Sequence, residues 1–227
     1  AVAAGLVDTV AVVGVEKSTD AIAGARVESR NVGIDADYES IHGASLPALA
    51  GMLMRRYMHE YEVELPAFEG FSINAHNNGR LNPNAMFKNT LRQGAFSKAA
   101  MVANPVNLFD GAPDADGAGA IILTANSRAV DLISQPIKVV GSAVATDRFK
   151  IQDRQQMLRL KAVNISTQKA LKQADLPLSD ISFFELHDAF TILTALSIEA
   201  IGLAEAGKGW ELASDHGKHI GLSGRTP

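Results

Sequence analysis

The stretch ISFFELHDAFT, Ile181 to Thr191, decides the fold because a strand pattern changes into a helix pattern inside it. ISFFEL is rich in branched and aromatic apolar residues and predicts a strand, whereas the continuation AFTILTALSIEAIGLA predicts a largely apolar helix that must be buried. Polar side chains interrupt the apolar pattern at the change, and they are Glu185, His187 and Asp188. A structural and a chemical role are both compatible with such a junction.

The junction follows the C-terminal end of a strand and precedes a helix, which is the edge where open α/β sheets bind ligands. We predict that Asp188 caps the helix, because its carboxylate can accept hydrogen bonds from free backbone N–H groups of the first turn. The helix dipole disfavours an imidazolium at His187, so a neutral ring can donate a hydrogen bond to a developing oxyanion. On the residues alone, a packed or capping histidine is the more frequent case, and both interpretations stay open.

Outside this stretch, strand patterns alternate with helix patterns. DTVAVVGVE (8–16) predicts a strand buried on both faces, as in a parallel or mixed sheet. DGAGAIILTANSRAVDLI (116–133) predicts a strand and a short helix, and PIKVVGSAVAT (136–146) predicts a further strand. This alternation predicts an α/β layered fold.

The helix patterns lie between these strands. A helix is predicted from about residue 46 to residue 61 with Ser45 as its N-cap, and Pro66 starts a second one that ends in turns at Asn-Asn-Gly and Asn-Pro. Residues 153–175 carry an apolar stripe at helical spacing. Residues 17–43 are polar and aperiodic, and we expect them to leave the core.

Composition limits the classes of function. The chain has 227 residues, 47% of them hydrophobic, a net charge of −4 and no cysteine. The sequence has no block of Lys and Arg that could bind along a phosphate backbone, and no apolar run long enough to span a bilayer. We therefore expect neither nucleic acid nor a membrane as a partner, and we expect a cytoplasmic location. The missing cysteine excludes disulfides and a thiolate nucleophile within this chain.

Other motifs are weak. The histidines His59, His76, His216 and His219 lack the HExxH spacing of a zinc site, and we predict no metal. The serines lack a G-x-S-x-G setting, which disfavours a serine hydrolase. An unrelated α/β hydrolase or isomerase using His187 and Glu185 as acid and base is an alternative that rests on this pair alone.

Five motifs together resemble one family. FFELHDAFT, DTVAVVGVEKSTD, LPALAGMLMRRYMHEY, NNGRLNPNAMF and PDADGAGAIIL are similar to thiolases, in particular to the archaeal and sterol-carrier-protein-type branch. The resemblance extends from about residue 1 to residue 215. The His-Asp-Ala-Phe form, in place of the Asn-Glu-Ala-Phe of many thiolases, is specific to that branch.

The resemblance implies a layered α/β/α/β/α fold with mixed sheets and an inserted loop domain, of which this chain is an incomplete, internal fragment. Residues 1–127 correspond to the latter part of the N-terminal thiolase half, with the loop domain at about 27–100. Residues 128–227 correspond to the first part of the C-terminal half.

The implied activity is acyl transfer between acyl-CoA thioesters, by Claisen condensation or by thiolysis of 3-ketoacyl-CoA. In the family a cysteine carries the acyl group, a histidine of a Gly-His-Pro motif activates it, and the histidine of His-Asp-Ala-Phe donates to the thioester oxygen. Only the last of these maps here, onto His187, and the other two fall outside the chain. Candidate residues lining the site are His76, Asn82, Glu185, Asp188 and Phe190.

The resemblance implies a coenzyme A thioester as substrate, without a permanently bound cofactor. It also implies a homo-oligomer, a dimer or a tetramer, and admits a larger complex with a synthase. The alternative is a catalytically inactive half-thiolase that binds CoA thioesters or a partner subunit, because a chain without nucleophile or base forms no acyl-enzyme.

Overall fold

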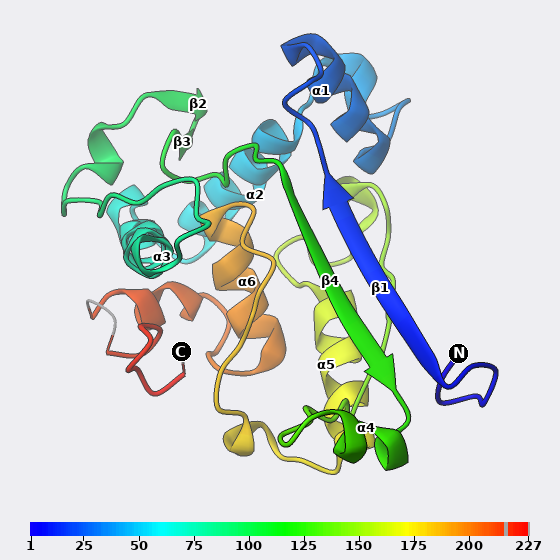
Figure 1. The fold of residues 1–227 in the computed structure, drawn as a ribbon. Coiled ribbons are helices and arrows are strands. Elements are labelled where there is room, and N and C mark those ends of the chain that lie inside the picture. Colours follow the sequence, from blue (N-terminus) through cyan, green and yellow to red (C-terminus); the bar gives the residue numbers. More distant parts are fainter. Residues whose placement is uncertain (216–217, 227) are drawn as a thin grey trace.

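A computed structural model describes residues 1–215 and 218–226 (Figure 1). Its strands are β1 (Thr9–Glu16), β2 (Met101–Ala103), β3 (Val106–Asn107) and β4 (Gly117–Thr124). Its α-helices are α1 (Ala23–Arg30), α2 (Leu46–Glu60), α3 (Glu69–Leu81), α4 (Asn126–Leu132), α5 (Lys161–Ala174) and α6 (Thr191–Ile201). Short 3₁₀ helices lie at Asn31–Gly33, Ser40–His42, Leu65–Phe68, Phe96–Lys98, Ile151–Asp153, Leu178–Asp180 and Gly209–Ala213. The predicted α/β class is confirmed.

The long strands β1 and β4 form an antiparallel ribbon along one side of the molecule (Figure 1). Their register pairs Thr9 with Thr124 and Val12 with Ile121. The two predicted strands therefore exist, but the burial on both faces expected for residues 8–16 is wrong, since nearly every residue of β1 is exposed. Both sheets of the described residues have two strands and antiparallel pairing, where mixed sheets were expected.

Two predicted strands do not form. Residues 136–146 and the ISFFEL segment, 181–186, carry no strand. Their branched residues favour an extended chain, but a strand also requires a neighbour that exchanges backbone hydrogen bonds, and within the described residues no segment pairs with either. The side chain of Ile137 is 98% exposed, which is consistent with the lack of such a neighbour.

The helix α2 follows its sequence prediction closely. The Ser45 hydroxyl accepts a hydrogen bond from the Ala48 N–H at 3.4 Å, and Pro47 occupies the first turn, where a missing N–H costs nothing. Its buried face carries Met54 and Tyr57, both 0% exposed. Residues 17–43 do not wholly leave the core, because Ile34 is buried among these side chains.

The helix α3 is longer than predicted. Pro66 lies in the first turn of the 3₁₀ helix Leu65–Phe68, which continues into α3. The expected turn at Asn77-Asn78-Gly79 is wrong, because α3 runs through it to Leu81. Propensity for turns is weak beside tertiary packing, and Phe71 and Ser72 on this helix are buried. The helix α5 also differs from its prediction. It begins at Lys161, whereas the apolar stripe over residues 153–175 predicted an earlier start.

The helix α6 lies at the centre of the helical part, between α5 and the pair α2 and α3 (Figure 1). It is buried along most of its length, as predicted, with Ile192 and Ala195 at 0% exposure. A buried polar contact joins it to α2: the Tyr57 hydroxyl donates to Glu199 Oε1 at 2.6 Å, and the Gly209 N–H donates to the same oxygen at 2.9 Å. One carboxyl group thus links α2, α6 and the 3₁₀ helix that follows.

Candidate functional site

The predicted cap at Asp188 is wrong. The helix α6 begins at Thr191 with Phe190 as its N-cap residue, so Asp188 lies two residues before the cap position. Its side chain is exposed and makes no hydrogen bond within the described part of the chain. The first N–H group of the helix, that of Thr191, instead finds its acceptor elsewhere in the fold.

That acceptor is Asp110, from the connection between β3 and β4. Its Oδ1 accepts hydrogen bonds from the Thr191 N–H at 3.1 Å and from the Thr191 hydroxyl at 2.5 Å. Asp110 is 4% exposed and Thr191 is 5% exposed, so water does not compete for these bonds. A carboxylate at a helix N-terminus also meets the positive end of the helix dipole.

Residues 107–112, which we call the clasp segment, hold the start of α6 through backbone contacts as well. Gly111 forms an isolated antiparallel bridge with Phe190, and the Ala112 N–H donates to the Ala189 carbonyl at 3.0 Å. A Cβ atom on Gly111 would lie 3.1 Å from the Phe190 ring, so glycine permits the close approach. Residues 189–191 are thereby fixed by a segment about 80 positions earlier.

The clasp segment contains unpaired polar atoms. Asp110 Oδ2 and Asn107 Nδ2 are buried and have no hydrogen-bond partner within the described residues. Burial raises the pKa of Asp110, and the two bonds from Thr191 act in the opposite direction. Asn107 Oδ1, in contrast, accepts from the Phe109 N–H at 2.8 Å and so shapes the turn.

His187 is exposed, as is Glu185. Neither side chain makes a hydrogen bond to a described residue, and so the structure does not join them as an acid–base pair. Phe190, the neighbour of His187 in the motif, is half-buried against the clasp segment. His187 therefore combines an accessible ring with a backbone that is anchored three residues further on.

His76 lies on α3 and contacts the clasp segment through Phe109. Its Nδ1 lies 2.8 Å from the Asn89 carbonyl oxygen, and its ring stacks on Phe87 at 5.8 Å between centroids. It also meets the edge of Phe109, at 6.1 Å between centroids. His76 and Phe190 thus both contact the clasp segment, from α3 and from the start of α6.

Asn82 has a local role that the structure identifies. It ends α3, and its Oδ1 accepts a hydrogen bond from the Asn84 N–H at 2.9 Å. This bond shapes the turn that leads toward Phe87. The structure shows no contact between Asn82 and the residues around His187.

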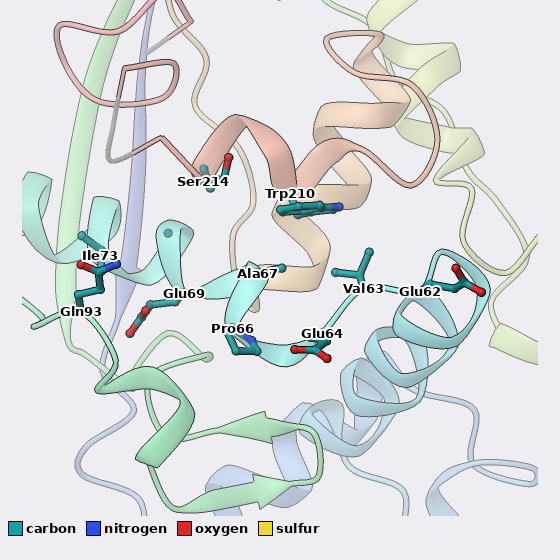
Figure 2. Close-up of a pocket in the computed structure, with 12 residues that line it drawn as sticks. Glu62, Val63, Glu64, Pro66, Ala67, Glu69, Ile73, Gln93, Trp210 and Ser214 are labelled. Atoms are coloured by element: carbon teal, nitrogen blue, oxygen red, sulfur yellow. The ribbon is translucent and has the colours of Figure 1, made fainter.

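Two clefts lie away from all of these residues. Figure 2 shows the first, a cleft of about 420 Å³ whose lining includes Trp210, Glu62 and Glu64. The second has about 550 Å³ and is lined by side chains that include Arg55 and His59. None of the predicted site residues lines either cleft. Sequence patterns carried no signal for them, because their walls come from distant parts of the chain.

The described residues contain no group of three side chains able to ligate a metal ion. His219 Nδ1 bonds to Asp215, and His216 lies outside the described residues. No helix in the part that the structure describes is long and apolar enough to cross a membrane.

Comparisons with known proteins agree on one relationship. The family model described as "Thiolase C-terminal domain-like" matches residues 143–227. The acetyl-CoA acetyltransferase of Methanothermobacter thermautotrophicus is 33% identical over 215 residues, covering 95% of this chain and 56% of that protein. The chain spans about half the length of such curated relatives.

Solved structures show the same fold. The Ltp2-ChsH2(DUF35) aldolase superimposes with a TM-score of 0.85 at 24% identity, covering 100% of this chain and 59% of that one. A monomeric SCP2-thiolase-like protein type 1 from Mycobacterium smegmatis gives a TM-score of 0.63 at 17% identity, covering 89% of this chain and 44% of that one. The fold is thiolase-like.

Proposed function

Because the chain belongs to the thiolase family, we propose that it forms part of an acyl-CoA acyltransferase. The reaction makes or breaks a carbon–carbon bond next to a thioester carbonyl, as in the condensation or thiolysis of 3-ketoacyl-CoA. His187 is the residue of this chain that donates a hydrogen bond to the thioester oxygen.

One observation carries the proposal: His187 has an exposed ring directly ahead of a helix whose first turn is anchored by buried contacts. An oxyanion donor must be reachable by substrate, and it must also be fixed before the charge develops. Exposure supports the first requirement, and the anchored start of α6 supports the second.

The chemistry suits an imidazole. When the bond next to the thioester carbonyl forms or breaks, the carbonyl oxygen gains negative charge, and a ring N–H that donates to this oxygen stabilises it. Removing such a donor typically lowers the rate about 10²- to 10³-fold. The carboxylates nearest in sequence, Glu185 and Asp188, make no hydrogen bond to the ring and so leave its single N–H free to donate to substrate.

The acyl carrier must be another group. The chain has no cysteine, and by the family resemblance the nucleophilic cysteine and the Gly-His-Pro histidine lie outside residues 1–227. The matched relatives are longer than this chain, which is compatible with that arrangement.

We also propose a coenzyme A thioester as substrate and a homo-oligomer in a cytoplasmic setting. The exposed apolar side chains of the ribbon β1–β4, such as Val13, Val15 and Ile122, support association, because an apolar surface of this kind favours burial. The structurally similar Ltp2-ChsH2(DUF35) aldolase combines two named components, and by analogy a second protein is a further candidate partner.

The test is thiolysis of acetoacetyl-CoA by the full-length protein that contains this chain. His187→Ala is expected to lower kcat about 10²- to 10³-fold while leaving the circular dichroism spectrum unchanged. His42→Ala is the matched control, because His42 is also an exposed histidine and lies outside the motif. Turnover of His187→Ala within about threefold of the control would remove His187 from the site.

The absence of cysteine from the chain favours one alternative, a half-thiolase that binds CoA thioesters or a partner subunit without catalysis. The intact mass of the protein from its natural source, with the reading frame on both sides of this segment, separates the two. A mass equal to that of the 227-residue chain, together with acetyl-CoA binding and no thiolysis, would establish the alternative.

A further inference from the structure

The start of α6 is held by a residue that no sequence motif marks. Asp110 supplies the carboxylate oxygen that accepts both the N–H and the hydroxyl of Thr191. The helix-forming stretch has no acceptor of its own at this point, since Phe190 is the N-cap residue and makes no side-chain cap. The first turn of α6 therefore depends on the clasp segment.

The same segment constrains the chain immediately before the helix. Its backbone bonds to Ala189 and bridges to Phe190, so consecutive residues 189–191 each have a partner in residues 110–112. Only Asp188 separates the bonded residue Ala189 from His187. A shift of this anchored strip would move the backbone of His187 with it.

We propose that Asp110 is a positioning residue for His187, acting through the cap on Thr191 and the adjoining bridge to residues 189 and 190. The Asp110 side chain makes its hydrogen bonds to Thr191 and none to His187. This inference rests on the proposed function only for the role of His187 as the hydrogen-bond donor to the oxyanion.

The carboxylate uses its oxygens unequally, which gives a sharp comparison. Oδ1 accepts both bonds from Thr191, whereas Oδ2 has no partner within the described residues. Asp110→Asn retains an acceptor oxygen for Thr191, and Asp110→Ala removes it. Positioning by hydrogen bonding thus predicts that asparagine preserves the arrangement and alanine loses it.

The test uses the ¹⁵N-labelled full-length protein that contains this chain and two NMR readouts, amide hydrogen exchange at Thr191 and the ring ¹H–¹⁵N signals of His187. Loss of a helix cap corresponds to about a 2- to 30-fold faster exchange at Thr191 in Asp110→Ala. The His187 ring signals shift in this variant, and both readouts stay near wild type in Asp110→Asn. Asp131→Ala, at an exposed position on α4, is the matched control.

A purely structural role gives a different pattern, with exchange accelerated equally in α2 and α6 and the His187 signals unmoved. That pattern, or equal behaviour of the alanine and asparagine variants, would overturn the proposal. If Asp110→Ala does not fold, Thr191→Val removes only the hydroxyl bond and is expected to accelerate Thr191 exchange less, with the same direction of shift at His187. Unchanged signals in Thr191→Val would then count against it.

The two proposals fail separately. If Asp110→Ala shifts the His187 signals but His187→Ala keeps full turnover in the full-length protein, the function is wrong and the positioning stands. If His187→Ala abolishes turnover but Asp110→Ala leaves both NMR readouts unchanged, the function stands and the positioning is wrong.

Discussion

The buried hydroxyl of Tyr57 allows one interaction to be tested in isolation. Tyr57 is 0% exposed, and its hydroxyl donates to Glu199 Oε1 at 2.6 Å, linking α2 to α6. Glu199 Oε2 has no partner among the described residues, and Oε1 has one further donor, the Gly209 N–H. Tyr57→Phe removes the hydroxyl, keeps the ring and leaves the Glu199 carboxyl group with a single donor.

The expected loss in the free energy of unfolding is about 1–3 kcal/mol, the range for removing one partner of a buried hydrogen bond. For a chain of this length, each kcal/mol lowers the melting temperature by about 2–4 °C. The ring keeps its packing against Phe68, so no cavity contributes beyond the hydroxyl.

Urea unfolding followed by the fluorescence of the only tryptophan, Trp210, measures this change, and Trp210 is adjacent to Gly209 in the same contact. Tyr38→Phe is the control, since Tyr38 is 59% exposed, and it should change stability by less than about 0.5 kcal/mol. A loss below about 0.5 kcal/mol in Tyr57→Phe at unchanged m value would refute the assignment of this bond as a stabilising link.

Burial, followed by the bond to Glu199, raises the pKa of Tyr57. Because the folded value lies above the unfolded value of about 10, the contribution of the protonated hydroxyl is complete below about pH 10 and is lost as the pH rises toward the folded value. The stability difference between wild type and Tyr57→Phe should therefore narrow above about pH 10.

Two further variants test packing and surface electrostatics. Gly70→Ala should lower the free energy of unfolding, measured in urea, by about 1–3 kcal/mol, because the added Cβ would lie 2.0 Å from the Ala213 carbonyl oxygen. This loss is expected although alanine normally favours a helix over glycine. Gly14→Ala, with open space around the added Cβ, is the control, and an equal effect of the two substitutions would contradict the clash. Thr19→Val should raise the pKa of Asp116 toward its ordinary range in an NMR titration, because the hydroxyl bond from Thr19 is the largest cause of its lowering. An unchanged pKa of Asp116 would exclude the hydroxyl bond as that cause.

Local signals predicted several elements correctly. Ser45 and Pro47 mark the start of α2 at its N-cap and in its first turn. The apolar stretch of α6 has no polar face, so the burial of that helix follows from the sequence. These features depend on residues a few positions apart. The motif containing His187, which resembles one family, is likewise a short continuous stretch of sequence.

The cap on α6 could not be predicted because its acceptor is remote. Asp188 satisfies the local rule for a cap, but the structure uses Asp110, which is 81 positions from Thr191. The available signal was indirect: Asp110 is the one charged residue in the stretch VNLFDGA, 106–112. Residues 136–146 and 181–186 failed for a related reason, because a strand depends on a partner that single-segment patterns do not identify.

The distance between Asp110 and Thr191 also sets an order of events during synthesis. At about 5–20 residues per second, Thr191 leaves the ribosome roughly 4–16 s after Asp110. Until then the clasp segment has no helix to hold, and the face of α2 that carries Met54 and Tyr57 lacks the helix that covers it. The contacts that α6 makes with α2, and the hydrogen bonds that anchor the start of α6, can therefore form only after Thr191 has emerged.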